Sequence, residues 1–185
     1  MGNAIAIKLH THYGQEVICD DRAHILDWEL AMTAWFSGCL ARPVPTTNGI
    51  LSWPTIEPYI KRPAPFNAHT AMINIEHPHN MGGGTLYAIE AIDEICQRAH
   101  ASNLKVHMDG ARLTNAWVKR GVTPAEIAAP CDSVWLDFTK GLGAPLGAVL
   151  AGSRDFIDRA WRWKQRLGGA MRQGGMNAAA CLYSL

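Results

Sequence analysis

The chain has 185 residues, of which 48% are apolar and 18% charged, with a formal net charge of +1. This length and composition allow one domain with a sizeable core. The near-neutral charge, without a basic run, argues against nucleic acid or an anionic membrane as the main partner. Apolar runs are short and interrupted, so we expect a cytoplasmic protein and no membrane span. Five widely spaced cysteines favour reduced thiols over a disulfide framework.

Apolar periodicity and turn residues predict strands that alternate with helices. In chain order we predict a helix at 1–10, a strand at 16–20, a helix at 23–35, a strand at 39–44, a short helix at 54–60, a strand at 71–76, a helix at 89–101, a strand at 105–109, a helix at 110–117, a β-like run from 133, a strand at 147–151, and helices at 154–167 and 176–185. This alternation is typical of an α/β fold, a mostly parallel sheet with helices on both faces.

One lysine, Lys140, follows the β-like run in a turn that contains Gly141, Gly143 and Gly147. The small residues allow a bulky ligand to approach, and the end of an apolar strand partly desolvates the amine. This environment suits a lysine that forms a Schiff base with a carbonyl compound. Taken alone, Lys140 fits an ordinary surface turn better than a reactive site, because a single lysine is a weak signal.

Polar residues gather at the predicted strand ends, where ligands bind in open α/β sheets. They are His24, the loop 77–84, the turn from Asp109 to Arg112, and Lys140. A lysine and an aspartate at two such ends fit a pyridoxal phosphate site, in which the lysine binds the cofactor and the aspartate pairs with its pyridinium nitrogen. His24 is then a candidate to stack on the ring, and it also fits a core histidine. Singly, Asp109 would also fit a helix cap.

Three segments together resemble the threonine aldolase family. They are His-Met-Asp-Gly-Ala-Arg at 107–112, Phe-Thr-Lys-Gly-Leu-Gly-Ala-Pro-Leu-Gly at 138–147, and Ala-His-Ile at 23–25 with Glu29. The segments 76–80 and 167–173 match further parts of the family in the right order. The family belongs to the aromatic amino acid β-eliminating lyase/threonine aldolase group of fold-type-I pyridoxal phosphate enzymes. The resemblance implies that 1–185 is the large cofactor domain, truncated at both ends, without the family's N-terminal segment and C-terminal small domain.

The resemblance also implies roles for individual residues in binding pyridoxal 5′-phosphate. Lys140 would bind the cofactor covalently, Asp109 would pair with its pyridine nitrogen, and His24 would stack on its ring. Arg112 would contact the cofactor's phenolic oxygen and hold the substrate carboxylate. No metal is expected.

Other residues are implied to act near the substrate's β-hydroxyl or the cofactor's phosphate. His79 and Glu29 would lie near the hydroxyl, and one of them would take its proton; the sequence does not decide between them. The family's Ser-Gly-Thr phosphate-binding turn would stand directly before Met1. Gly2 and Asn3 would then open a helix whose N-terminus faces the phosphate.

The function implied is a lyase that cleaves L-threonine or a related β-hydroxy-α-amino acid to glycine and an aldehyde. Two alternatives stay open: a β-eliminating amino acid lyase that uses the same cofactor, and an inactive remnant or a chain active only with a partner. Because family members form dimers or tetramers, the resemblance implies a homo-oligomer that acts on a small amino acid.

Overall fold

The computed structural model describes residues 1–185 and contains one six-stranded sheet, in the order β2-β1-β3-β4-β5-β6. The strands are β1 (Glu16–Asp20), β2 (Leu40–Val44), β3 (Thr70–Glu76), β4 (Lys105–Asp109), β5 (Ser133–Asp137) and β6 (Ala148–Gly152). The first five are parallel, and β6 pairs antiparallel with β5. The predicted mostly parallel sheet is confirmed.

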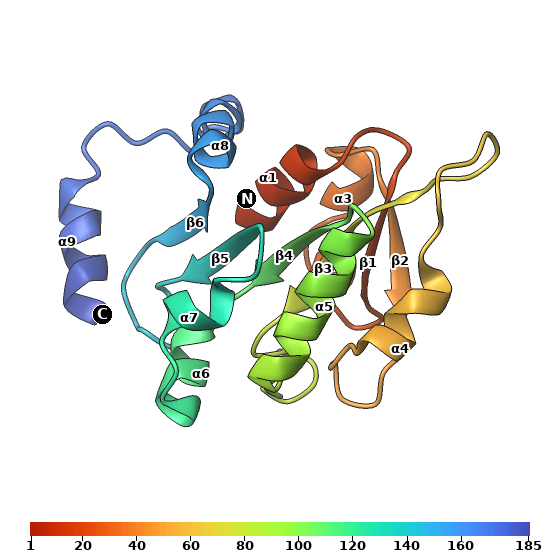
Figure 1. The fold of residues 1–185 in the computed structure, drawn as a ribbon. Coiled ribbons are helices and arrows are strands. Elements are labelled where there is room, and N and C mark those ends of the chain that lie inside the picture. Colours follow the sequence, from red (N-terminus) through yellow and green to blue (C-terminus); the bar gives the residue numbers. More distant parts are fainter.

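Helices cover both faces of this sheet (Figure 1). One face carries α1 (Gly2–His10), α3 (Met32–Trp35) and α8 (Arg154–Arg166). The other carries α4 (Trp53–Ile56), α5 (Ile89–Ala101), α6 (Leu113–Arg120) and α7 (Pro124–Ala128). The remaining helices are α2 (His24–Asp27), a 3₁₀ turn η1 (Glu57–Tyr59) and α9 (Gly175–Ser184). This layered arrangement agrees with the fold class predicted from the sequence.

Each face of the sheet has its own apolar cluster, because successive strand residues point in opposite directions. In β1, Ile18 joins the larger cluster, with Ile73 of β3 and Val106 of β4, on the side of α5. Its neighbours Val17 and Cys19 join the smaller cluster, on the side of α1. Burial on both faces explains why these strands read as continuous apolar runs rather than as alternating ones.

The helix predicted over 23–35 is wrong: the structure has two short helices there, α2 and α3. Between them, Leu30 and Ala31 have φ angles of 51° and 55°, in the left-handed region. In one continuous helix, His24 and Glu29 would lie about 140° apart around the axis. The break lets the chain turn back, so that these two side chains meet.

One helix, α7, is absent from the prediction although the sequence carries a signal for it. The Thr123 hydroxyl accepts a hydrogen bond from the backbone N–H of Glu126, and the Glu126 carboxylate accepts one from the N–H of Thr123. Pro124 occupies the start of the helix, where its missing N–H costs nothing. This capping box defines the start of α7.

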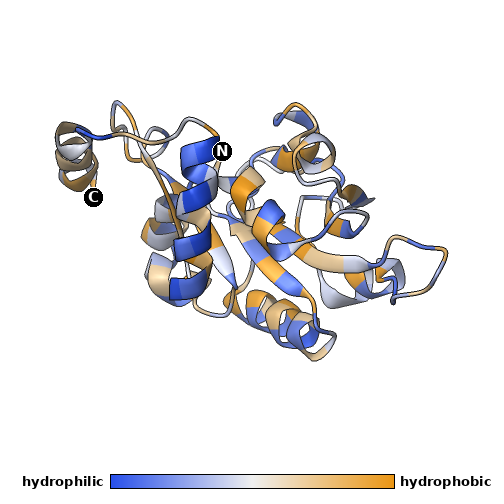
Figure 2. Cartoon of the chain, turned by 90° about the horizontal axis from the view of Figure 1, so that it is seen from above, coloured by the Kyte–Doolittle hydropathy of each residue, from blue (hydrophilic) through white to orange (hydrophobic).

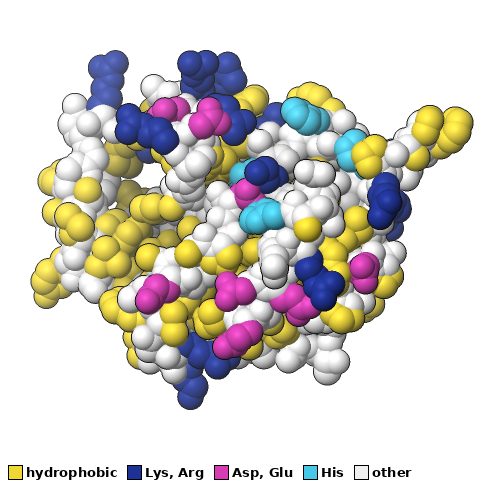
Figure 3. Space-filling model, in the orientation of Figure 1, with side chains coloured by type: hydrophobic (Ala, Val, Ile, Leu, Met, Phe, Trp, Pro, Cys, Tyr) yellow, Lys and Arg dark blue, Asp and Glu magenta, His cyan; other side chains and the backbone are white.

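The C-terminal helix α9 lies apart from the sheet and buries none of its residues. Met176, Leu182 and Tyr183 are exposed on it. Seen from above, α8 is mostly hydrophilic and α9 mostly apolar (Figure 2). Hydrophobic side chains gather along α9 and beside it at the left of the space-filling view (Figure 3). None of the helices has the length and apolar character needed to cross a membrane.

Candidate active site

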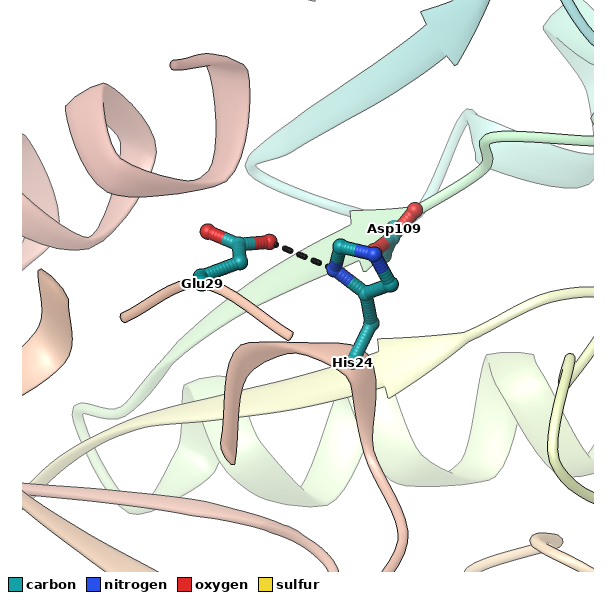
Figure 4. Close-up of side chains that lie close together, drawn as sticks. All are labelled: His24, Glu29 and Asp109. Carbon is teal, nitrogen blue, oxygen red and sulfur yellow. Dashed lines mark hydrogen bonds and ion pairs between the residues drawn. The ribbon is translucent and has the colours of Figure 1, made fainter. Parts of the chain in front are cut away.

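Three of the residues singled out in the sequence meet at the carboxyl edge of the sheet (Figure 4). Asp109 ends β4, His24 opens α2 just after β1, and Glu29 follows in the turn after α2. The Nδ1 atom of His24 lies 2.9 Å from Oε1 of Glu29. One ligand atom from each of the three residues lies within 4.8 Å of the others. We call these three residues the carboxyl-edge cluster.

An amide from α1 links the two carboxylates of the carboxyl-edge cluster. The Asn3 Nδ2 donates to Oε1 of Glu29 over 2.6 Å and to Oδ2 of Asp109 over 2.8 Å. The other oxygen of Asp109 accepts from the N–H of Ala111 over 3.1 Å. Both Asp109 oxygens therefore have a donor, and the carboxylate is held in one orientation.

A further buried acid, Glu76, holds the backbone around the cluster. Its Oε2 accepts from the N–H of His24 over 3.0 Å, and its Oε1 accepts from the N–H of Asn80 over 2.8 Å. Glu76 thus ties the start of α2 to the polar loop that follows β3. No role for Glu76 is predicted from the sequence, although this residue ends β3 beside that loop.

Burial and hydrogen bonds shift the ionisation of the cluster. Burial, with a contribution from the charge of Glu76, raises the pKa of Asp109 to about 6. The hydrogen bond to Glu29 raises the pKa of His24. Burial opposes ionisation of Glu29, but hydrogen bonds from His24 and Asn3 outweigh it and lower the pKa of Glu29. The hydrogen bond between His24 and Glu29 therefore favours the charged form of each partner.

Lys140 lies in the turn after β5, as the sequence predicts. Its side chain is 26% exposed, and its Nζ lies 3.5 Å from Oδ2 of Asp137 and 5.1 Å from the centre of the Trp135 ring. The lysine charge is near enough to oppose protonation of His24. Arg112 precedes α6 and is half-buried, and its guanidinium makes no hydrogen bond or ion pair within the chain.

His79 lies outside the carboxyl-edge cluster. Its ring is fully buried, with Nε2 lying 3.1 Å from Oδ1 of Asp20. The N–H of Gly82 donates to its Nδ1 over 3.0 Å. A Cβ on Gly49 would approach this ring to 2.3 Å, so the glycine is needed for the ring to fit. His79 is therefore packed into the loop after β3 with both ring nitrogens facing polar groups.

The start of α1 lies beside the same edge of the sheet. A Cβ on Gly2 would come within 2.0 Å of the Trp135 ring, so only glycine allows α1 to lie this close to β5. Asn3 directs its side chain to the carboxylates and not outward. The role of both residues in binding the cofactor stays a prediction.

Three polar residues that the sequence analysis does not single out extend the network. His107 Nε2 lies 3.0 Å from Oδ1 of Asn3, and His107 Nδ1 lies 2.7 Å from the Ser133 hydroxyl. His10 Nε2 lies 2.8 Å from the same hydroxyl. A signal for His107 exists in the sequence: it precedes Asp109 by two residues in a strand, and so shares its face.

Comparison with known proteins places this arrangement in a family. The family model described as β-eliminating lyase matches residues 1–185, the whole chain. The chain belongs to the β-eliminating lyase family. The resemblance to the β-eliminating lyase/threonine aldolase group inferred from the sequence is confirmed.

Relatives within this β-eliminating lyase family include named threonine aldolases. The low specificity L-threonine aldolase of Escherichia coli is 35% identical over 99% of this chain and 54% of its own length. Low-specificity L-threonine aldolase 1 of Arabidopsis thaliana is 35% identical over 100% of this chain and 53% of its own. The chain thus spans about half the length of these curated relatives. The Leishmania major threonine aldolase structure shares the fold, with a TM-score of 0.87 at 23% identity, over 97% of this chain and 52% of that one.

The residues of this member of the β-eliminating lyase family fit pyridoxal phosphate. Asp109 is a buried carboxylate held in one orientation by Asn3 and Ala111, and it would be the partner of the ring nitrogen. His24 offers an imidazole beside it, and Lys140 offers a partly buried amine just after β5, the strand next to β4. This combination of one acid, one imidazole and one amine matches the chemistry of the cofactor ring.

The buried histidines predict acid sensitivity. Burial lowers the pKa of His107 to about 3 and that of His77 to about 4, from 6.5. Below pH 6.5 the unfolded chain therefore binds protons that the folded chain does not bind. The free energy of unfolding falls as the pH falls through this range. At about pH 4.5 each histidine should cost roughly 2 kcal/mol of unfolding free energy.

The acid prediction is checked by urea unfolding at neutral pH and at about pH 4.5. In His77→Asn, the amide oxygen can still accept from the N–H of Tyr87, now 3.2 Å from His77 Nδ1. The acid-induced loss should shrink by roughly 2 kcal/mol in this variant. The matched control His12→Asn, at an exposed histidine, should lose as much as the parent. Equal losses in all three proteins would contradict the prediction.

Proposed function

We propose that this chain is the large domain of a pyridoxal phosphate-dependent aldolase that cleaves L-threonine or a related β-hydroxy-α-amino acid to glycine and an aldehyde. The observation that carries the proposal is the carboxyl-edge cluster with Lys140 beside it. The named threonine aldolases that match the whole chain support the substrate class. When bound, the cofactor supplies an electron sink for the pair released from the Cα–Cβ bond.

The residues of the chain then have separate tasks. Asp109 holds a proton on the ring nitrogen, for which its orientation by Asn3 is suited. His24 packs against the ring, and Lys140 supplies the amine that binds the cofactor. Arg112 binds the substrate carboxylate, because its guanidinium has no partner within the chain.

We propose Glu29, rather than His79, as the base that takes the β-hydroxyl proton. Both hydrogen bonds to Glu29 reach Oε1, so Oε2 is free to accept a proton. The lowered pKa of Glu29 keeps the carboxylate ionised. The Nδ1 lone pair of His79 already accepts from Gly82, which leaves this ring without a free acceptor. A positioned base of this kind contributes about 10²–10⁴-fold to a rate.

Product analysis tests the proposal. The purified chain is supplied with pyridoxal phosphate and L-threonine, and the products are separated and identified. An aldolase yields one glycine and one acetaldehyde for each threonine consumed. Formation of 2-oxobutyrate and ammonia would instead support β-elimination, the reaction for which the family is described. Consumption of no threonine would contradict both activities for this chain.

The assembly and location of the protein follow from the same proposal. We propose a homo-oligomer in the cytoplasm that acts on a small amino acid. The support is the resemblance to the threonine aldolases, whose named members act on L-threonine.

A further inference from the structure

The amide of Asn3 stands in an unusual electrostatic position, between two carboxylates. Its two N–H groups point to Glu29 and Asp109 over 2.6 and 2.8 Å. A rotation of the amide by half a turn would place Oδ1 against both carboxylates and leave them without these donors. The orientation of this one amide therefore decides whether Oδ2 of Asp109 has a donor and whether Glu29 has a donor besides His24.

The oxygen of the Asn3 amide lies against His107. Its ring is fully buried, and burial keeps it neutral by lowering its pKa to about 3. Oδ1 of Asn3, 3.0 Å from Nε2 of His107, can only accept, so Nε2 carries the hydrogen. In a neutral imidazole the other nitrogen is then an acceptor, and Nδ1 accepts from the Ser133 hydroxyl over 2.7 Å.

The same direction of hydrogen-bond donation extends back to His10, the last residue of α1. The only hydrogen of the Ser133 hydroxyl is donated to Nδ1 of His107. The hydroxyl oxygen therefore accepts from Nε2 of His10 over 2.8 Å. The His10 ring stacks on Phe156, with ring centres 4.7 Å apart. Burial also lowers the pKa of His10, to about 4, so this ring is neutral too. The whole chain of donors runs one way, from His10 to the carboxylates.

We propose that His107 is a positioning residue of the active site, which holds the Asn3 amide in the orientation that donates to both Asp109 and Glu29. Its importance for turnover rests on the proposed function, but its effect on the two carboxylates belongs to the chain itself. The negative charges near Asp109 are those of Glu29 and Glu76. Because these charges oppose ionisation of Asp109, the donor from Asn3 is needed to offset them.

Three substitutions of His107 distinguish a role in positioning Asn3 from a purely steric role in the core. In His107→Gln the amide nitrogen reaches the place of Nε2 and can still donate to Asn3. In His107→Asn the amide reaches only the place of Nδ1, facing Ser133, and His107→Leu has no donor at all. The readout is the pKa of Asp109 in the protein without cofactor, followed by the carboxyl ¹³C shift of labelled aspartate. The Asp109 resonance is assigned by its absence from Asp109→Asn.

We expect the Asp109 pKa to rise by about one unit in His107→Asn and His107→Leu, because the charged form loses a donor. In His107→Gln it should stay within about 0.3 unit of the parent. His77→Gln, at another fully buried histidine, is the matched control and should leave Asp109 unchanged. An Asp109 pKa that is the same in all folded His107 variants, or that shifts equally in His77→Gln, overturns the proposal.

The parent protein provides a second test that needs no variant to fold. The ¹⁵N shifts of its histidine rings report which nitrogen carries the hydrogen. We expect His107 to be neutral at pH 7 with the hydrogen on Nε2, and a hydrogen on Nδ1 would overturn the proposal. Neither measurement involves cofactor or substrate, so a chain without lyase activity still tests this inference. Lyase activity together with an unshifted Asp109 would refute the inference alone.

Discussion

Replacing Lys140 with alanine should abolish the covalent adduct that borohydride reduction fixes between this chain and pyridoxal phosphate. The adduct requires a primary amine within reach of the bound aldehyde, and alanine offers none. Lys140 lies just after β5, close to the Trp135 ring of that strand, and its side chain is 26% exposed. An amine that is accessible but partly buried suits formation of this adduct. Mass spectrometry of the reduced and digested protein measures the adduct on the peptide that contains position 140.

A second lysine provides the matched control. Lys164 lies 4.4 Å from the centre of the Trp161 ring, so it too is an amine beside an indole, but on α8. Lys164→Ala should form the adduct with the same yield as the parent. If Lys140→Ala kept the full yield, the assignment of Lys140 would be wrong, and the labelled peptide would identify the amine responsible.

Replacing Asp109 with asparagine should leave the covalent adduct in place and slow the cleavage of L-threonine by about 10²-fold or more. The amide has nearly the shape of the carboxylate, and its oxygen can still accept from the N–H of Ala111. It carries no charge, however, and cannot hold a proton on a ring nitrogen. Initial rates at saturating cofactor, compared with adduct yields, separate the two effects.

The control for this substitution is a carboxylate on the surface. Asp155→Asn removes an exposed acid that pairs with Arg159 on α8 over 3.0 Å, and surface pairs of this kind contribute little. It should leave both the adduct and the rate unchanged. A rate in Asp109→Asn equal to that of the parent would refute the role of Asp109.

Much of the fold is readable from local pattern. The strands at 16–20 and 105–109 are predicted to the residue, because short apolar runs ended by aspartate leave little freedom in their bounds. In a parallel sheet such strands deliver their final residues to the same edge. The meeting of His24 and Asp109 therefore follows from topology that the alternation of strands and helices already predicts.

The contact between His24 and Glu29 is different, because it depends on a helix break for which the sequence carries no signal. Leu30 and Ala31 are ordinary helix formers, yet both adopt left-handed backbone angles. Their helix propensity predicts a continuous helix, in which His24 and Glu29 would lie apart. The tertiary fold overrides local preference here, and the unfavourable backbone angles lie beside the candidate active site.

The support of the carboxylates by His107 depends on contacts between distant parts of the chain. Asn3 and Asp109 are 106 positions apart, and His10 and Ser133 are 123 apart. The apolar periodicity of a single segment cannot predict such long-range contacts. The resemblance implies that Asn3 binds the cofactor, which stays a prediction, and the contact of its side chain with two acids is visible only in the structure.

These long-range pairings also determine when, during folding, the candidate active site forms. Asp109 obtains its donor from Asn3 only after α1, near one end of the chain, has packed against β4, and the Ser133 hydroxyl reaches His107 only when β5 has joined the sheet. Contacts between residues so far apart are entropically costly to close before the intervening chain is ordered. An emerging or partly folded chain therefore has the carboxylates without their supporting donors. The site is complete only in the fully assembled sheet.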